Sequence, residues 1–355
     1  MFQTKKNISK LFYSLFYFLL ITILLVSMFI FTGCSTTVSK QIPKEKISDK
    51  NLGSFVGGLI GLETTLLDGA PPDIIQDEGL TPFSFVMVVE NKGEAAVGPG
   101  TDNPFAVARI SGMNHAHFGL TETTAVQKLD NSLSPMKRNF DGSISSGAFH
   151  HFSFENMAYK QNLFNSLTLT LRGEICYDYE TLATVKFCVK KDLFENAQDA
   201  TLCSLRGDLP FGNSAAPLQI TKVEEAPVND NTVQINFVIE HFGSGIFFYR
   251  NEPKDLYDAC VFEERNPHIY KLEVLVEPVQ KNTYDINCLR LEEKLPGGGA
   301  SGLIRLYKNA PITMTCFVKR TSESSVRVYE DLLNIKLRYR YGEFIEKPVM
   351  IRAHP

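Results

Sequence analysis

The sequence predicts an all-β protein in which two tandem β-sandwich domains follow an N-terminal apolar helix. Apolar and polar residues alternate over short stretches throughout residues 55–355, and no stretch of ten or more residues has the period of an amphipathic helix. One strand pattern also recurs about 150 residues later. The chain has 355 residues, of which 44% are apolar and 21% charged, so it can form two cores.

The first element is an apolar, uncharged run from Leu11 to Phe31, which follows three lysines. A basic segment, an apolar core and small residues at the exit are the layout of a secretory signal. The run closes on Phe31-Thr32-Gly33-Cys34, which resembles the lipobox of prokaryotic lipoproteins. The resemblance implies a signal peptide at residues 1–33 and a lipid on Cys34, which becomes the mature N-terminus.

The alternative interpretation of this run is an uncleaved transmembrane helix, because it is long enough to cross a bilayer. Both interpretations keep the three lysines inside and place residues 35–355 outside the cytoplasm, in the cell envelope and attached to a membrane. Residues 34–54 are predicted to be a flexible tether, since they are polar, rich in lysine and without an apolar period.

Strands are predicted where apolar residues occupy every second position. Pro82–Glu90 is the clearest example, and Asn91-Lys92-Gly93-Glu94 follows it as a turn in which Asn and Gly can accept positive φ. A turn near Leu182 separates the last two strands predicted for the first domain. The other strands of that domain are Phe105–Ser111, Ala148–Phe154, Leu167–Tyr177 and Ala183–Lys190.

Thr232–Glu240 repeats the pattern of Pro82–Glu90 in the same phase, and Gly243 matches Gly93. The apolar positions Val233, Ile235, Phe237 and Ile239 match Phe83, Phe85, Met87 and Val89. Near the end of each unit, Ile175–Tyr179 is echoed by Leu337–Tyr341, and both contain Tyr-x-Tyr. The two matched patterns occur in the same order in both units. This predicts two copies of one fold, at residues 55–212 and 213–355, with the boundary near Leu209–Pro217.

Each unit holds seven to nine short predicted strands separated by turn signals, a pattern typical of a β-sandwich. The sequence resembles tandem immunoglobulin-like domains of prokaryotic surface proteins. Val88-Val-Glu-Asn-Lys-Gly93 resembles the V-x-N-x-G signature of CARDB-like adhesion modules. With Ala70-Pro-Pro-Asp73 and the Tyr-x-Tyr strand it is also similar to uncharacterised secreted proteins of archaea. In the second unit His241-Phe242 replaces Asn-Lys, and the resemblance implies no catalytic residues.

Seven cysteines become six when Cys34 is assigned to the lipid. An even number in an exported chain predicts up to three disulfides, and no C-x-x-C spacing supports a zinc site. Each unit contains three of them, so either one bridge crosses the boundary or each unit keeps a free thiol. The six are Cys176, Cys188 and Cys203 in the first unit and Cys260, Cys288 and Cys316 in the second.

Two pairings compete in the first unit. Cys176 and Cys188 lie in the polar phase of neighbouring predicted strands, so a turn between those strands places them opposite each other. Cys188–Cys203, which closes an acidic loop, is the alternative. In the second unit we expect Cys288–Cys316, and the remaining two cysteines are left unassigned.

Four histidines are the candidate metal ligands. His115 and His117 share a face if they lie in a strand, and His150 and His151 lie in another predicted strand. Adjacent strands would let three of them bind Zn²⁺ or Cu²⁺. The simpler interpretation, and the one we adopt, is that they are surface or turn histidines and that the chain holds no metal or cofactor.

Acidic loops offer oxygen ligands for Ca²⁺. One follows Pro71-Pro72 and contains Asp73, Asp77 and Glu78, and another contains Asp255 and Asp258. Acidic loops are more often simply solvated, so neither is predicted to bind an ion.

Gly297–Gly302 is glycine-rich, but no lysine follows it and no helix begins there. It is therefore predicted to be a hairpin loop between Leu291–Leu295 and Leu303–Leu306. Phe247-Phe248-Tyr249 is predicted to be a buried strand, with an exposed aromatic patch as the alternative. No nucleophile or metalloprotease motif is present. A glycosidase carboxylate pair stays open, since it leaves no sequence spacing.

Removing residues 1–33 lowers the formal net charge from −4 to −7, because that segment holds three lysines and no acid. The mature chain has no basic block, which argues against nucleic acid as a partner. The sequence thus favours a non-enzymatic surface lipoprotein whose two domains bind a protein or envelope polymer or serve a structural role. The alternative is an exported hydrolase or metal-dependent enzyme with a site between the domains.

Overall fold

The computed structural model describes residues 55–190, 203, 207–251, 260, 266–307, 310–321 and 328–354. The described residues all belong to one compact unit, Lys50–Pro355. The predicted signal peptide, the lipobox with Cys34 and the tether lie outside the described residues. In the described ranges, none of the helices has the length and apolar character needed to cross a membrane.

Strands make up nearly all the regular structure of Lys50–Pro355, as predicted, and a 3₁₀ helix η1 (His115–Phe118) lies among them. We call residues 55–190 the first half and residues 207–354 the second half. The first half contains β1 (Leu62–Leu66), β2 (Ile74–Gln76), β3 (Phe83–Asn91), β4 (Ala106–Ser111), β5 (Val126–Lys128), β6 (Lys137–Arg138), β7 (Ile144–Ser145), β8 (Phe149–Met157) and β9 (Leu167–Lys190).

The second half contains a further series of strands, which alternate buried and partly exposed side chains as the sequence predicted. They are β10 (Gly207–Asp208), β11 (Phe211–Asn213), β12 (Leu218–Asn229), β13 (Thr232–His241), β14 (Ile246–Phe248), β15 (Lys271–Pro278), β16 (Tyr284–Cys288), β17 (Glu293–Lys294), β18 (Ala300–Arg305), β19 (Ile312–Arg320) and β20 (Val328–Arg352).

The strands form β-sandwich-like layers. One long sheet has the order β17-β18-β15-β20-β9-β4-β5, with β11 beside β9 and with β14 and β2 beside β20. A three-stranded sheet, β1-β3-β8, belongs to the first half, and a five-stranded sheet, β10-β12-β13-β19-β16, belongs to the second. All these pairings are antiparallel except that of β2 with β20.

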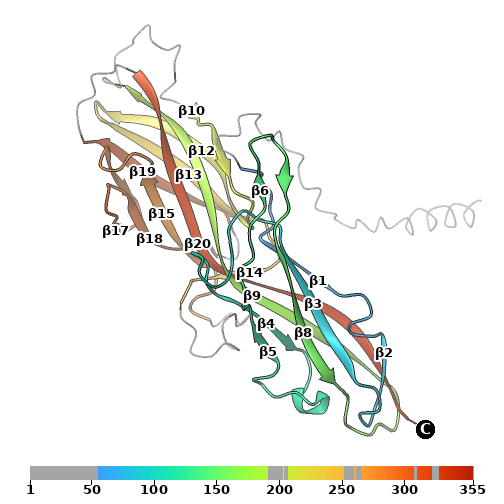
Figure 1. The fold of residues 1–355 in the computed structure, drawn as a ribbon. Coiled ribbons are helices and arrows are strands. Elements are labelled where there is room, and N and C mark those ends of the chain that lie inside the picture. The colour runs from blue at the N-terminus through green and yellow to red at the C-terminus, as the bar shows by residue number, and fades with distance from the viewer. Residues whose placement is uncertain are drawn as a thin grey trace, which may run out of the picture. The chain divides into compact units, whose positions relative to one another are not determined.

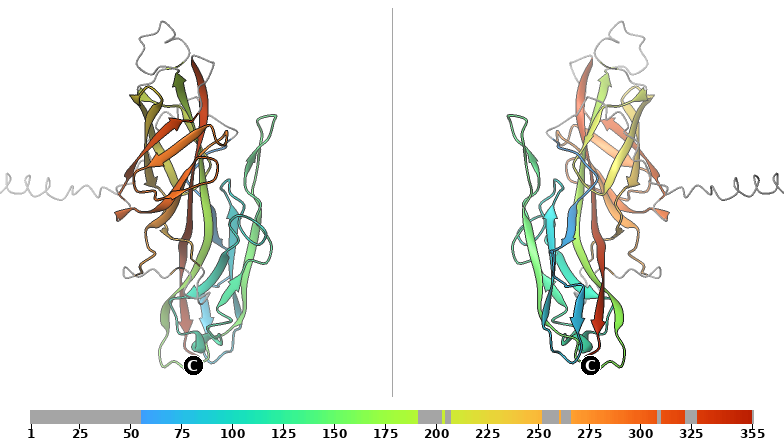
Figure 2. Two further views of the ribbon diagram at one scale, coloured as in Figure 1. Left: turned by 90° about the vertical axis from the view of Figure 1, so that its left-hand side faces the viewer. Right: turned by 90° about the vertical axis from the view of Figure 1, so that its right-hand side faces the viewer.

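The strands β9 and β20 are the longest elements described, and they lie side by side in every view of Figures 1 and 2. They pair without interruption from Leu167–Ile351 at one end to Lys190–Val328 at the other. The predicted turn near Leu182 is therefore wrong. The segment from Tyr177 to Ala183 contains no Gly, Pro or Asn, and β20 offers it a continuous partner, so the strand does not turn.

The predicted repeat appears as matching strand pairings. β3 lies between β1 and β8, and β13 lies between β12 and β19. Leu62 pairs with Asn91 in the first half, while Leu218 pairs with His241 in the second, which keeps the offset of 150 residues between β3 and β13. β4 then pairs with β9 as β15 pairs with β20.

The two halves share their long strands. The last part of β20 pairs with the part of β9 that lies beside β4, and the last part of β9 pairs with the part of β20 that lies beside β15. The predicted boundary between residues 212 and 213 consequently does not separate the sheets. Buried apolar side chains from both halves form one continuous cluster.

Candidate functional site

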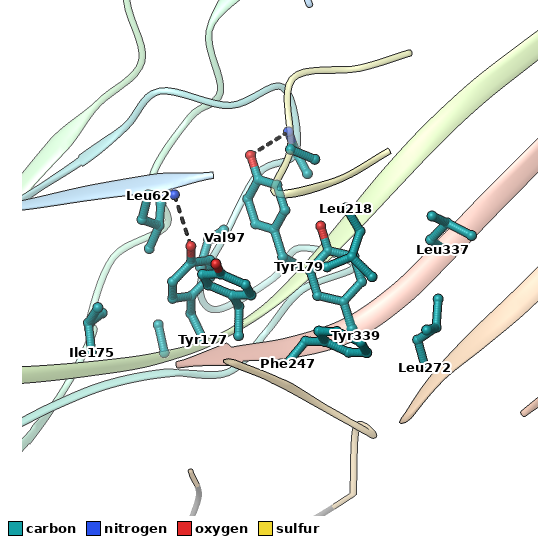
Figure 3. Close-up of a cluster of buried hydrophobic side chains, with 14 of the residues drawn as sticks. Leu62, Val97, Ile175, Tyr177, Tyr179, Leu218, Phe247, Leu272, Leu337 and Tyr339 are labelled. Atoms are coloured by element: carbon teal, nitrogen blue, oxygen red, sulfur yellow. Dashed lines mark hydrogen bonds between the residues drawn. The ribbon is translucent and has the colours of Figure 1, made fainter. Parts of the chain in front are cut away.

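Four tyrosines of the repeated Tyr-x-Tyr pattern meet where the two halves join, and Figure 3 labels three of them, Tyr177, Tyr179 and Tyr339. Tyr177 pairs with Tyr341 and Tyr179 pairs with Tyr339, so all four side chains lie on one face of the β9–β20 ribbon. Each is at most 2% exposed. Their position in the core comes from strand alternation, and their hydroxyls need partners there.

Three of the tyrosine hydroxyls accept hydrogen bonds from backbone N–H groups, one at the start of β1, one in the loop after β3 and one in the loop before β14. Tyr177 Oη accepts a hydrogen bond from Leu62 N at 3.1 Å, where β1 starts. Tyr179 Oη accepts one from Ala95 N at 3.3 Å, and Tyr341 Oη accepts one from Gly245 N at 2.8 Å. Ala95 and Gly245 are 150 residues apart, so the repeat also places equivalent hydrogen bonds.

Burial raises the pKa of all four phenols, which therefore stay protonated at physiological pH. Tyr339 Oη lies 3.1 Å from Thr181 Oγ1, and His241 Nε2 lies 3.1 Å from Tyr341 Oη. A protonated, enclosed phenol with its partners already in place is suited to structural support, not to acid–base chemistry.

The repeated glycines next to this cluster have a role that differs from the predicted one. Gly93 does not adopt the positive φ expected of the turn. A Cβ at Gly93 would collide with the hydroxyl of Tyr179, and a Cβ at Gly243 would collide with that of Tyr341. Glycine is required because each tyrosine hydroxyl occupies the space of a side chain.

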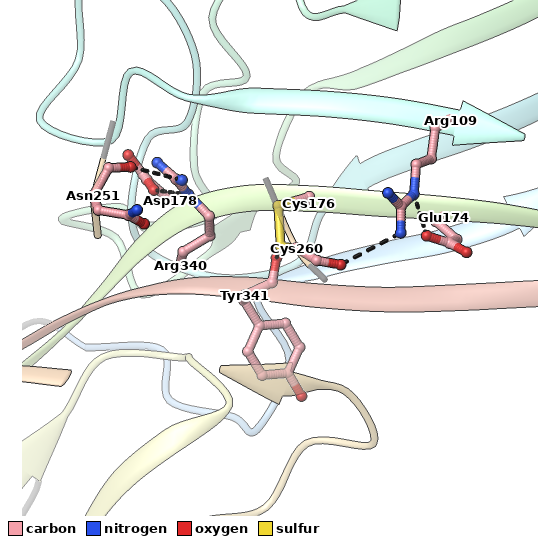
Figure 4. The surroundings of a disulfide bond; sticks show 8 residues. All are labelled: Arg109, Glu174, Cys176, Asp178, Asn251, Cys260, Arg340 and Tyr341. Atoms are coloured by element: carbon pink, nitrogen blue, oxygen red, sulfur yellow. Dashed lines mark hydrogen bonds and ion pairs between the residues drawn. A yellow bond between two sulfur atoms is a disulfide. The ribbon is translucent and has the colours of Figure 1, made fainter. Parts of the chain in front are cut away.

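The opposite face of the ribbon carries a buried ion pair at its centre (Figure 4). Arg340 Nε donates to Asp178 Oδ1 at 2.9 Å, and Nη1 donates to the carbonyl of Asn251 at 2.8 Å. The guanidinium also stacks on the ring of Phe105 at 4.0 Å from its centroid. Both charges are almost fully buried, so each depends on the other.

Two more arginines join the halves on this side. Arg250, from the second half, donates to the carbonyl of Tyr179 at 2.7 Å and to the side chain of Asn103. Arg109, from the first half, pairs with Glu174 and donates to the carbonyl of Cys260 at 3.4 Å. The three guanidinium groups therefore all have partners within the protein, carboxylates for Arg340 and Arg109 and backbone carbonyls and an amide for Arg250.

All six predicted cysteines form disulfides. Cys288–Cys316 is the expected pairing, and it joins β16 to β19. Cys188–Cys203 is present, so the competing Cys176–Cys188 pairing is wrong, because β9 does not fold back on itself. Cys176 instead bonds to Cys260 in the second half, which is the bridge across the boundary left open by the sequence.

The candidate metal histidines do not gather. His115 and His117 lie in η1 and not in a strand, because Asn114 accepts from Ala116 N and caps a helical turn there. His150 and His151 lie on β8, where the ring of His150 packs against Phe152. In the part of the chain that is described, no three His, Cys, Asp or Glu side chains are placed to hold a metal ion.

The acidic loop after Pro71-Pro72 is used structurally. Asp77 is 1% exposed, and its carboxylate accepts from Leu163 N at 2.9 Å and from His354 N at 2.8 Å. Asp73 pairs with Lys347 at 2.9 Å, and Glu78 bonds to Asn162. The second acidic loop, with Asp255 and Asp258, lies outside the described residues.

Two further predictions are confirmed. Gly297–Gly302 lies at the β17–β18 hairpin, although β17 is shorter than the strand predicted there and β18 is longer and begins three residues earlier. Phe247 and Phe248 are buried in β14, which pairs with β20, whereas Tyr249 follows the strand and is half-buried.

An open cleft of about 310 Å³ is a candidate binding space. It is lined by Phe55, Glu94, Ala95, Pro135, Met136, Lys137, Arg138, Glu180, Leu182 and Ser214. Its volume is at the lower end of ligand sites. Residues from the start of the first half, from the base of the β6–β7 hairpin and from the middle of β9 thus meet in one place.

Both carboxylates of the cleft already have partners. Glu94 accepts from Val56 N at 2.8 Å, Gly57 N at 2.9 Å and Ala215 N at 2.7 Å. Glu180 faces Arg338 at 3.6 Å. The cleft is therefore suited to binding more than to general acid–base catalysis, which requires a carboxyl group free to reach the substrate.

Sequence reasoning missed the cleft and the β6–β7 hairpin that borders it. The signal available was Asn139-Phe-Asp-Gly142, in which Asp-Gly is a strong turn signal next to an apolar residue. The other residues that line the cleft come from four distant parts of the sequence, and no spacing connects them.

No protein-family model and no curated protein match the chain. Among solved structures, the secreted serine protease VesC from Vibrio cholerae shows similarity over 79% of this chain and 51% of that chain. The identity is 9% and the TM-score 0.15. This chain spans about half the length of that protease, and a likeness this weak carries no inference about activity.

Proposed function

We propose that the chain is a membrane-anchored lipoprotein of the cell envelope whose β-structure acts as a rigid, non-enzymatic structural or adhesion-type binding module. In this proposal the two halves are immunoglobulin-like domains joined by their last strands. The observation that carries it is the use of buried polar groups as internal supports: the tyrosine hydroxyls, Asp178–Arg340 and Glu94 all bind within the protein.

The location has independent support. Three disulfides indicate an oxidising, extracytoplasmic compartment. The apolar run that ends in Gly33-Cys34 supports export and lipid attachment. The proposed anchor would hold the β-structure at the membrane surface through the tether of residues 34–54.

The alternative is an exported hydrolase with a site between the halves. The cleft is the feature that comes nearest to supporting it. Glu94 and Glu180 line the cleft, but one carboxylate accepts three backbone hydrogen bonds and the other faces Arg338. The four candidate histidines are dispersed over η1 and β8, which weakens the metal-dependent form of this alternative.

Replacing Cys34 tests the anchor. We expect Cys34→Ala to abolish lipid attachment and to lower the membrane-bound share of the protein, while the neighbouring Ser35→Ala behaves as wild type. Metabolic labelling with a fatty acid, membrane fractionation and intact mass would measure both effects. A wild-type chain that stays in the membrane unlabelled, with residues 1–33 still attached, would replace the lipoprotein with the uncleaved helix.

The binding role needs a separate test. Crosslinking on intact cells with the wild-type protein and with Cys34→Ala should capture a protein or envelope polymer that depends on membrane attachment. Failure of both forms to capture any partner would count against an adhesion-type module and leave the structural role.

A further inference from the structure

The β6–β7 hairpin forms a sheet of its own and pairs with neither neighbouring sheet. Figure 2 shows it in green, standing away from the other strands. Its turn is held by internal hydrogen bonds, from Asn139 N to the carbonyl of Ser143 at 2.8 Å and from Gly142 N to the carbonyl of Asn139 at 3.0 Å. The tip therefore has a defined conformation without a packing partner.

The hairpin displays apolar side chains that nothing in the described residues covers. Phe140 at the tip is fully exposed, and Ile144 is 53% exposed. Lys137 and Arg138 lie exposed on the preceding strand. Asp141 is the acid of the turn, and its carboxylate accepts from the backbone N and the hydroxyl of Ser143. Segments that lie in a membrane interface combine aromatic side chains with nearby cations, as this hairpin does.

The base of the hairpin is fixed next to the point where the tether joins the β-structure. Arg138 Nε donates to the carbonyl of Phe55 at 3.2 Å, and Met136 N donates to the carbonyl of Gly93 at 2.8 Å. Residues 35–54 separate Cys34 from Phe55. The composition of this segment predicts a flexible tether, and a tether of that length has an end-to-end distance of roughly 25 Å, so the proposed anchor would keep the hairpin close to the bilayer.

We propose that the β6–β7 hairpin contacts the membrane surface, with Phe140 in the interfacial region and Lys137 facing lipid phosphates. This inference rests on the proposed lipid anchor. The contact would orient the β-structure on the membrane, with the cleft beside the hairpin base near the lipid surface.

The absence of tryptophan from the sequence gives a direct test. Phe140→Trp places a single fluorophore at the hairpin tip. Phe164→Trp is the matched control, since Phe164 is equally exposed but follows the other end of β8. Nine residues of extended strand separate those ends by about 30 Å.

The full-length lipidated variants would be reconstituted into phosphatidylcholine vesicles with or without phosphatidylglycerol. We expect the emission of Phe140→Trp to shift to the blue, to be quenched by brominated lipid and to be shielded from iodide, with a larger effect in anionic vesicles. Phe164→Trp should remain accessible to iodide. Adding Lys137→Gln to Phe140→Trp should lower the equilibrium constant for contact in anionic vesicles about fivefold.

The outcomes separate this inference from the anchor. Vesicle-bound protein in which both tryptophans remain exposed to iodide would overturn the hairpin contact and leave the anchor intact. Equal shifts at both positions would mean non-specific adsorption and would also overturn it. Protein that does not float with the vesicles would refute the lipid anchor. If Phe140→Trp also shows no shift in emission, the hairpin contact would be refuted as well.

Discussion

At the scale of single residues, Glu225 has the largest rise in pKa among the carboxyl groups of the described residues. It lies on β12, 2% exposed, and Oε2 accepts from the backbone N of Cys188 at 3.1 Å. Within the described residues Oε1 has no hydrogen-bond partner. Burial raises the pKa of Glu225 to about 8, against the opposing effects of the Cys188 hydrogen bond and of Lys190. The folded protein thus holds this carboxyl protonated at neutral pH.

This pKa predicts how stability depends on pH. The unfolded chain releases the proton near the ordinary value of 4.5, while the folded chain keeps it until about 8. Glu225 therefore makes the free energy of unfolding fall as pH rises between these values. We expect Glu225→Gln to be more stable than wild type at pH 9, by on the order of 4 kcal/mol, and to differ little at pH 4.5.

Urea denaturation of both proteins at pH 4.5, 7 and 9 would measure this difference. Burial also raises the pKa of Glu343, to about 7, but that effect is the same in both proteins and cancels. Stability curves that run parallel across the pH range would contradict the protonated state of Glu225.

At the scale of elements, side-chain interactions at the centre of the long β9–β20 ribbon help to hold it in place. Four tyrosines lie on one face and Asp178–Arg340 on the other, because successive side chains of a strand point to opposite sides. The tyrosine face binds the start of β1 and two loops, and Arg340 on the charged face binds the carbonyl of Asn251. A strand of this length is thereby held at its middle as well as along its hydrogen-bonded edges.

Removing one charge from this centre should be costly. Asp178→Asn leaves Arg340 buried without a counter-ion, and we expect a loss of about 3–5 kcal/mol in the free energy of unfolding. The matched control is Asp285→Asn, because Asp285 and Lys294 pair at 2.7 Å with both side chains more than half exposed. That change should cost less than about 1 kcal/mol.

Urea denaturation at one pH would compare the two variants. The double variant Asp178→Leu/Arg340→Met should recover much of the loss, since it removes both buried charges. Equal costs for Asp178→Asn and Asp285→Asn would show that the buried pair does not hold the ribbon together.

At the scale of the whole molecule, the two halves are not independent. Each contributes its last strand to the sheet of the other, and Cys176–Cys260 joins them across a sequence separation of 84 residues. In the chain-entropy account, a loop of that length gives a disulfide stabilisation of roughly 4–5 kcal/mol. Separating the halves would break both the ribbon and this bridge.

We therefore expect Lys50–Pro355 to unfold in a single cooperative transition. Differential scanning calorimetry of the oxidised protein would give equal calorimetric and van't Hoff enthalpies. A shortened chain that ends before Glu343 should lose stability in the first half as well, because β9 from Leu167 to Ile175 loses its β20 partner. Two separate transitions would indicate that the halves fold as independent domains.

Local patterns were enough to predict much of the strand content. The alternation in β3 and β13 placed the right side chains in the core, since a half-buried strand needs an apolar residue at every second position. The offset of 150 residues also correctly anticipated matching strand pairings. At His115–His117, by contrast, the metal hypothesis required a strand, but Asn114 caps a helical turn there. Periodicity alone does not decide between a strand and a capped turn.

The sequence by itself determined the β-rich fold, the repeat, an even set of cysteines and the apolar segment that predicts export. Each depends on composition or on spacing along the chain. Only the tertiary structure decided that β9 continues past Leu182, that Cys176 bonds to Cys260, and that a free hairpin borders the cleft. These features depend on which distant segments lie next to each other, and long-range pairing across more than 100 residues leaves no periodic trace in the sequence.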